Sequence, residues 1–188
     1  MKQQTQLDEP RLRDEEIILR AKEDTAAFRP LYERYYKVIF VFVLHRIGEK
    51  NVTADITSQV FLKALLNIKR YQFQGLPFSS WLYRIAVNEC NDFFRRTKRE
   101  RMVVLEEKHV ENLYDELFGD DLRQELKQKL PSILEKLKEP ELQLIELRFL
   151  DGRPFKEIAE ILGVSEISAK TRTYRILDKM KKMFVRKK

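Results

Sequence analysis

The fold is decided by the stretch Phe155-Lys156-Glu157-Ile158-Ala159-Glu160-Ile161-Leu162-Gly163-Val164-Ser165. Its apolar residues Ile158, Ala159, Ile161 and Leu162 recur at the spacing of one helical face. Gly163 is expected to end this helix, because glycine adopts the left-handed conformation of a helix C-cap without steric cost. Ser165 is placed to cap a second helix by accepting a hydrogen bond from its free backbone N–H groups. Two helices joined by a tight turn that holds one glycine form the helix-turn-helix pattern.

The second helix of this pattern is expected to have a cationic side and a buried side. Its cations are Lys170, Arg172, Arg175 and Lys179. Its apolar residues, on another side, are Ile176, Leu177 and Met180. A helix of this kind fits the major groove of DNA. A small helical hairpin with a solvated basic side is the other interpretation, but the agreement of turn, cap and charge favours DNA binding.

The composition narrows the class of protein. The chain has 188 residues, of which only 5 are Gly and 6 are Pro. This disfavours an all-β fold, which needs many turns, and favours helices. The net charge of +7 suggests a polyanionic partner, but by itself it also suits an anionic membrane surface. No apolar run reaches the ~18 residues of a membrane span, and the N-terminus lacks a signal-peptide core. Cys90 is the only cysteine and His45 and His109 are the only histidines, so neither an intrachain disulfide nor a zinc site of the usual type is expected. A reducing cytoplasm fits these facts.

Two helices are expected near the N-terminus. Residues 1–12 are expected to be disordered or loosely attached, and Asp14–Ala21 to begin a helix, since acids at a helix start suit its dipole. Pro30 fits the first turn of the next helix. The apolar and aromatic run from Leu31 to Leu44 indicates a buried helix, because it is long for a strand.

Two further helices complete the N-terminal part. Thr53 or Asp55 can cap a helix that runs to about Arg70. Its apolar positions are Ile56, Val60, Phe61, Ala64, Leu65 and Ile68. Another helix is expected from Phe78 to about Arg99. It ends in a basic cluster, Arg95, Arg96, Lys98, Arg99 and Arg101. The cluster is denser than helix capping requires, which favours phosphate contact.

An acidic segment separates the two basic regions. We expect residues 102–127 to be a flexible linker, either a solvated spacer or a mimic of nucleic acid inside a partner's basic channel. Beyond it, residues 130–137 and 141–150 are expected to be helices, with Pro131 and Pro140 in their first turns. The chain is therefore predicted to be all-α. It is expected to have an N-terminal domain at 1–101 and a C-terminal helix-turn-helix domain at 128–188.

Two motifs in this order identify a resemblance. The first is Trp81-Leu82-Tyr83-Arg84-Ile85-Ala86 followed by Asn88 and Asp92, and the second is Glu157 to Ser165 with Lys170-Thr171-Arg172. Over about residues 14–183 the chain resembles a bacterial extracytoplasmic-function sigma factor of the sigma-70 family. Asp55-Ile56 with Phe61-Leu62-Lys63-Ala64 resembles the family's clamp-binding helix, although Ser58-Gln59 replaces its usual Gln-Glu. Ile167 and Ala169 stand where the family tends to have Gly and Val.

The resemblance implies a protein that is not an enzyme and needs no cofactor or metal. It would give core RNA polymerase its promoter specificity, and an anti-sigma factor would be a further partner. Contacts to the upstream (minus thirty-five) duplex are implied for Ser165, Glu166, Ser168, Lys170, Thr171, Arg172 and Arg175. Contacts to the opened minus ten strand are implied for Phe78, Ser79, Arg84, Asn88, Asp92, Arg95 and Arg96. Polymerase contacts are implied for Asp55, Ile56, Gln59 and Phe61. For Trp81 we prefer a core role.

Two other classes of protein fit the sequence less well. A helix-turn-helix regulator acting on duplex DNA without polymerase would need dimer symmetry, and the chain has no sustained heptad seam. A nuclease would need a cluster of carboxylates or histidines to hold metal. The acids of this chain lie in the linker or on helix faces instead.

Overall fold

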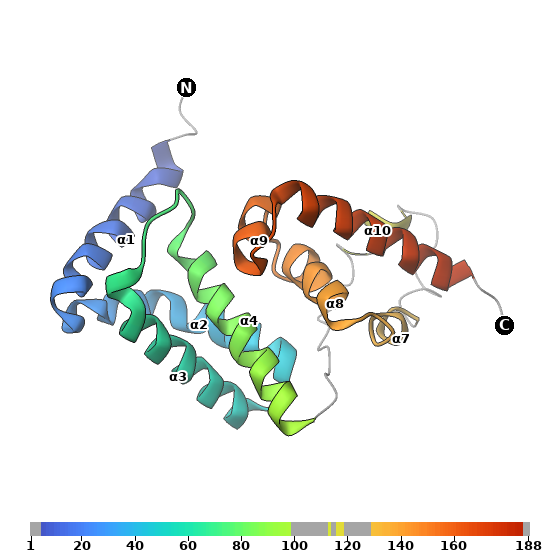
Figure 1. Cartoon of the computed structure of the whole chain (residues 1–188), viewed down its shortest axis with the longest axis horizontal. Helices are drawn as coiled ribbons and strands as arrows, with labels where there is room; N and C mark the ends of the chain where they lie inside the picture. Colours follow the sequence, from blue (N-terminus) through green and yellow to red (C-terminus); the bar gives the residue numbers. More distant parts are fainter. Residues whose placement is uncertain (1–4, 99–112, 114–115, 119–128, 186–188) are drawn as a thin grey trace. The chain divides into compact units, whose positions relative to one another are not determined.

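The structure, a computed structural model, describes residues 5–98, 113, 116–118 and 129–185. Every element in these residues is helical (Figure 1), which confirms the all-α prediction. The chain divides into two compact units, Met1–Glu100 and Arg101–Lys188. The linker predicted for 102–127 lies outside the described residues, apart from Leu113 and residues 116–118, which are helical. The domain boundaries proposed from the sequence therefore remain predictions.

The N-terminal unit is a helical bundle. Its elements are α1 (Thr5–Glu23), the 3-10 turn η1 (Thr25–Phe28), α2 (Arg29–Ile47), α3 (Lys50–Asn67), the 3-10 turn η2 (Ile68–Arg70) and α4 (Phe78–Thr97). Helices α2, α3 and α4 pack on one another, and α1 lies against η1 and η2 (Figure 1). The core between them is apolar and includes Leu31, Ile39, Val43, Val60, Ala64, Leu82 and Ala86. Burial of these side chains is the main force that holds four otherwise marginal helices together.

Two helix starts differ from the sequence prediction. The helix expected from Asp14 begins at Thr5, since the polar residues ahead of Asp14 are mostly good helix formers. The helix expected to be capped by Thr53 or Asp55 has Glu49 as its N-cap. Gly48 causes this early start, because its left-handed conformation (φ 76°) ends α2 and turns the chain at once into α3. Thr53 lies inside α3, and its Oγ1 donates a hydrogen bond to the Glu49 carbonyl at 2.7 Å.

A buried carboxylate fastens α1 to α2. Asp14 is 5% exposed and accepts hydrogen bonds from Arg34 Nη1 and Tyr35 Oη, both on α2. Burial and the hydrogen bond to Asp14 raise the pKa of the Tyr35 hydroxyl, so this phenol stays protonated. At the C-terminal end of α1, Lys22 Nζ donates to the Tyr71 carbonyl at 2.7 Å. The segment after η2 is thereby tied to the first helix of the bundle.

The C-terminal unit consists of α7 (Leu130–Leu134), α8 (Glu139–Ile145), a π-helical turn η4 (Glu146–Leu150), α9 (Phe155–Leu162) and α10 (Glu166–Val185). Pro131 and Pro140 both stand in a first helical turn, as predicted. The helix predicted for 141–150 is completed by η4, in which the Asp151 N–H donates to the Glu146 carbonyl five residues back at 2.9 Å. The helix-turn-helix prediction is confirmed by the order α9, tight turn, α10.

Candidate nucleic-acid interface

The turn between α9 and α10 has the geometry that the sequence predicts. Gly163 adopts φ 66° and ψ 38°, the left-handed conformation that ends α9. The Val164 N–H donates back to the Ala159 carbonyl at 3.0 Å. Ser165 Oγ accepts a hydrogen bond from the Ser168 N–H at 3.1 Å, so this serine caps α10. These local bonds fix the direction in which α10 leaves the turn.

Helix α10 has one buried and one exposed side. Its buried side chains are Ala169, Thr173, Ile176, Leu177, Met180 and Phe184. Of the seven predicted duplex contacts, which lie on or just before α10, six are exposed and Ser168 is half-buried. The exposed residues are Ser165, Glu166, Lys170, Thr171, Arg172 and Arg175. A long helix that presents cations and short polar groups outward from a capped start has the form of a major-groove recognition helix.

Lys179 differs from the other cations predicted for this helix. It is half-buried and its Nζ donates to both carboxylate oxygens of Glu141 on α8, at 2.8 Å and 2.6 Å. Burial acts to raise the pKa of Glu141, but hydrogen bonds from Lys179 and from the Lys138 backbone outweigh it, so the pKa lies below its usual value. Lys179 therefore attaches α10 to α8 and does not belong to the exposed cationic side.

The start of α9 is held by an arginine pair. The Arg148 guanidinium lies over the Phe155 ring, 4.9 Å from its centroid, and donates to the Arg153 carbonyl at 3.2 Å. Arg153 in turn pairs with Glu157 one turn into α9, also at 3.2 Å. The Phe155 ring lies 6.4 Å from that of Tyr174 on α10. These contacts connect η4, α9 and α10 into one rigid support for the recognition helix.

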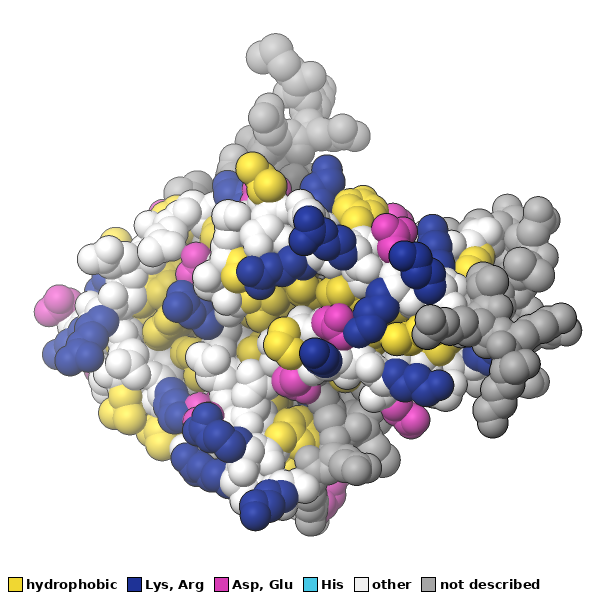
Figure 2. All heavy atoms as spheres, turned by 45° about the vertical axis from the view of Figure 1, so that its right-hand side comes forward, with side chains coloured by type: hydrophobic (Ala, Val, Ile, Leu, Met, Phe, Trp, Pro, Cys, Tyr) yellow, Lys and Arg dark blue, Asp and Glu magenta, His cyan; other side chains and the backbone are white. Residues whose placement is uncertain are grey.

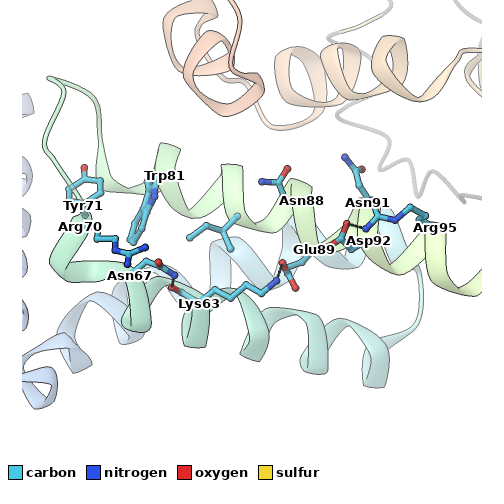
Figure 3. Close-up of a pocket in the computed structure, with 11 residues that line it drawn as sticks. Lys63, Asn67, Arg70, Tyr71, Trp81, Asn88, Glu89, Asn91, Asp92 and Arg95 are labelled. Carbon is cyan, nitrogen blue, oxygen red and sulfur yellow. Dashed lines mark hydrogen bonds and ion pairs between the residues drawn. The ribbon is translucent and has the colours of Figure 1, made fainter.

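A second candidate surface is a groove of about 670 Å³ in the N-terminal unit, between α3 and α4 (Figure 3). Its lining combines aromatic rings, amides and cations. The residues are Lys63, Asn67, Arg70, Tyr71, Trp81, Ile85, Asn88, Glu89, Asn91, Asp92 and Arg95. Figure 3 shows Tyr71 and Trp81 at one end and Asp92 and Arg95 at the other. Lys63 on α3 is paired with Glu89 on α4, which joins the two walls.

The structure buries two residues of the predicted strand-binding site. Phe78 is 2% exposed and packs against the rings of Phe28, Tyr35, Tyr71 and Trp81, with centroids 5.3 to 6.4 Å away. Ser79 is 7% exposed. Both face the core because they open α4 at the point where it meets the other helices. Trp81, for which a core role was expected, is only half-buried and lines the groove instead.

The remaining predicted strand contacts are accessible on α4. Arg84, Asn88, Arg95 and Arg96 are exposed, and Asp92 is half-buried. Asp92 Oδ1 pairs with Arg95 Nη2 at 2.8 Å. The predicted list of strand contacts omitted Lys63, Asn67 and Asn91. Helical spacing along α4 groups Asn91 or Asp92 with Asn88 and Arg95, but the opposite wall from α3 is visible only in the fold.

The predicted polymerase-binding residues divide between the two sides of α3. Asp55 and Gln59 are exposed, whereas Ile56 (8%) and Phe61 (4%) are largely buried in the bundle. Leu62 and Leu66, which the prediction omitted, are 47% and 72% exposed. Asp55, Gln59, Leu62 and Leu66 follow the i, i+4, i+7, i+11 spacing of one helical face. We call these four residues the outer face of α3.

The surface chemistry agrees with a nucleic-acid partner. Lys and Arg side chains, dark blue in Figure 2, outnumber the magenta Asp and Glu side chains on the face in view, in line with the net charge of +7. Among the described residues there is no group of three or more His, Cys, Asp or Glu that could hold a metal ion. None of the helices described is long and apolar enough to cross a membrane.

Comparison with known proteins decides the family. A family model for sigma-70 region 2 matches residues 31–100, and a model for sigma-70 region 4 matches residues 127–180. The ECF RNA polymerase sigma factor BldN of Streptomyces coelicolor is 31% identical over 162 residues, which are 85% of this chain. The chain belongs to the extracytoplasmic-function group of the sigma-70 family.

Other relatives agree with this assignment. The ECF sigma factor SigW of Bacillus subtilis is 28% identical over 170 residues, 86% of this chain and 90% of SigW. The chain spans 61% of the length of BldN. The solved structure of CnrH in complex with the cytosolic domain of CnrY superposes with a TM-score of 0.59 at 20% identity, covering 89% of this chain and 94% of CnrH. That likeness supports the fold of this sigma factor. Region 2 corresponds to the bundle that holds the groove, and region 4 to the unit that ends in α10.

Proposed function

We propose that this sigma factor directs core RNA polymerase to promoters by binding two DNA elements in two different forms. Helix α10 reads an upstream element as duplex, and the groove between α3 and α4 holds one strand of the opened start-proximal element. The main support for this proposal is the exposed cationic and polar side of α10, which follows a turn formed by Gly163 and Ser165. It supports duplex reading because a helix inserted in the major groove reaches base edges with its first turns.

The groove is suited to a single strand. Unstacked bases are held by aromatic rings, and the Tyr71 and Trp81 rings lie 4.8 Å apart at one end of it. Amides such as Asn67 and Asn88 can hydrogen-bond to base edges, and Arg95 and Arg96 can contact phosphates. Opening a duplex costs about 1.4 kcal/mol per base-pair step in stacking, and binding of the released bases offsets part of this cost. Accessible contacts for this strand are therefore Arg84, Asn88, Asp92, Arg95 and Arg96.

The outer face of α3 is proposed as the polymerase-binding surface. It joins two polar residues, Asp55 and Gln59, to two exposed leucines, Leu62 and Leu66. Exposed leucines are costly in water, and burial of each in an interface stabilises it by up to about 2 kcal/mol. The polar side chains of Asp55 and Gln59 then fix the orientation of the bound polymerase. Ile56 and Phe61 support this face from inside the bundle.

Further parts of the proposal follow from the family resemblance. The protein acts as a specificity subunit without enzymatic activity of its own, in the cytoplasm where core polymerase works. An anti-sigma factor is a proposed partner. The proposed domain limits are 1–101 for polymerase and minus ten binding, 102–127 for the acidic linker and 128–188 for duplex reading. A duplex-only regulator is not favoured, because it leaves the region 2 match at residues 31–100 without a role.

Gel filtration of the full chain with purified core RNA polymerase tests the proposal. We expect the chain to co-elute with polymerase and the complex to retard promoter duplexes that neither component retards alone. The double variant Asp55→Ala, Gln59→Ala should lose co-elution while its circular dichroism spectrum is unchanged. A wild-type chain that elutes separately from polymerase but binds duplex DNA as a dimer would replace this proposal with the regulator alternative.

A further inference from the structure

One large hydrophobic side chain lies on the exposed side of the recognition helix. Ile167, the second residue of α10, is 81% exposed, the largest exposed fraction among the large hydrophobic side chains described. Ile167, Thr171 and Arg175 are spaced by four residues and share one face, and all three are exposed. Ala169 and Thr173, which are fully buried, point to the opposite side. Ile167 is therefore directed away from the protein.

Single exposed hydrophobic residues are common on protein surfaces, so exposure alone would mean little. The position of Ile167 in the helix makes its exposure informative. It lies in the first turn of α10, directly after the Ser165 cap, and its neighbours Glu166, Ser168 and Lys170 are all polar. The first turn of a recognition helix is the part that reaches base edges in the major groove. An isoleucine there has no donor or acceptor, so it cannot hydrogen-bond to any base.

The major groove offers one apolar group to such a side chain, the C5-methyl of thymine. Adenine, guanine and cytosine edges present donors and acceptors, which an isoleucine would desolvate without replacing their hydrogen bonds. We propose that Ile167 packs on a thymine methyl in the upstream element and sets a preference for thymine at that base pair. This inference rests on the proposed reading of duplex DNA by α10. It assigns a base preference to a residue that the sequence-derived list of contacts omitted.

The test removes the methyl group from the DNA and the side chain from the protein. Duplexes are first selected from a randomised library with the wild-type chain bound to core polymerase. Each thymine of the selected upstream element is then replaced in turn by deoxyuridine, which lacks only the C5-methyl. We expect one replacement to weaken wild-type binding about fourfold, the factor for burying one methyl-sized group. Ile167→Ala should weaken binding to the thymine duplex by a similar or larger factor and should no longer distinguish thymine from deoxyuridine at that position.

Two control variants make the result specific. Ile167→Val keeps a branched apolar side chain and should retain most of the discrimination. Leu19→Ala changes another exposed aliphatic residue, 64% exposed on α1, and should leave discrimination intact. If the wild type is indifferent to every deoxyuridine, or if Ile167→Ala discriminates as well as the wild type, the inference is overturned. Failure of the wild-type complex to select any upstream sequence would instead overturn the duplex-reading function of α10, so the two failures are distinguishable.

Discussion

Lys179 of α10 and Glu141 of α8 form a two-oxygen ion pair, with Nζ 2.8 Å from Oε1 and 2.6 Å from Oε2. Glu141 Oε2 also accepts a hydrogen bond from the Lys138 N–H at 2.8 Å, at the start of α8. One carboxylate thus satisfies a free backbone donor of α8 and attaches the recognition helix to it. The pair joins residues 38 apart in sequence.

This pair predicts a pH dependence of stability. The pKa of Glu141 is lowered in the folded state, so its contribution is complete at pH values well above 4.5, its ordinary value, and is lost as the pH falls through the lower folded pKa. We expect the thermal midpoint of the wild type to fall in that acidic range, and Glu141→Gln to show a smaller fall. Circular dichroism melts from pH 7 to pH 3 measure both. Glu135→Gln, at an exposed carboxylate of the same unit, is the control and should follow the wild type. Equal pH curves for all three proteins would contradict the prediction.

The aromatic cluster around Phe78 predicts a large loss of stability. Phe78→Ala would leave a cavity among Phe28, Tyr35 and Tyr71 and should destabilise the chain by about 3–5 kcal/mol. Phe73→Ala, at a side chain 44% exposed, should cost less than about 1 kcal/mol. Urea unfolding followed by circular dichroism compares them. Phe78→Ala could instead unfold at the wild-type urea concentration and yet bind single-stranded DNA poorly. That result would assign Phe78 a direct DNA contact in place of a stabilising role in the core.

The outer face of α3 predicts a defect confined to polymerase binding. Leu66→Gln changes a side chain that is 72% exposed, so the fold should be unaffected while co-elution with core polymerase is reduced. Leu19→Gln, on α1 and 64% exposed, is a matched control that should co-elute normally. Analytical gel filtration with core polymerase separates the two variants. Equal co-elution of both would show that the polymerase surface lies elsewhere on the chain.

The exposed cations of α10 predict a defect confined to DNA. Arg172→Ala should weaken binding of the polymerase complex to upstream duplex by about 1–3 kcal/mol if Arg172 reads a base. If it contacts phosphate instead, the loss should be smaller and the slope of log affinity against log salt should fall by about 1. Fluorescence anisotropy at several stated salt concentrations distinguishes the two roles. Unchanged affinity at every salt concentration would remove Arg172 from the interface.

Local features of the fold were predictable from sequence, because neighbouring residues determine them. Gly163 and Ser165 end one helix and cap the next through bonds to residues three to five positions away. Pro30, Pro131 and Pro140 marked helix starts for the same reason. The start of α3 was predicted too late, because Gly48 turns the chain earlier than the capping residues Thr53 and Asp55 suggested.

The interface residues were less predictable, because burial depends on helices far apart in sequence. The apolar spacing of α3 already grouped Ile56 and Phe61 with Val60 and Ala64, and the structure agrees with that spacing. The family motif suggested polymerase contact for both, which their burial in the structure disfavours. The ion pair of Lys179 with Glu141 and the pairing of α3 with α4 around the groove had no local signal at all.

The two sides of α3 also have a consequence for the genetics of this protein. Substitutions at inward residues such as Val60 and Ala64 should lower the amount of protein that survives in the cell, and cooler growth or any general stabilising change should suppress them. Substitutions at Leu62 or Leu66 should leave normal amounts of a protein that cannot initiate transcription. Only compensating changes in a polymerase subunit should suppress those. A screen for suppressor mutations would thus separate the inward from the outward positions of α3. It would also identify the polymerase subunit that the helix contacts.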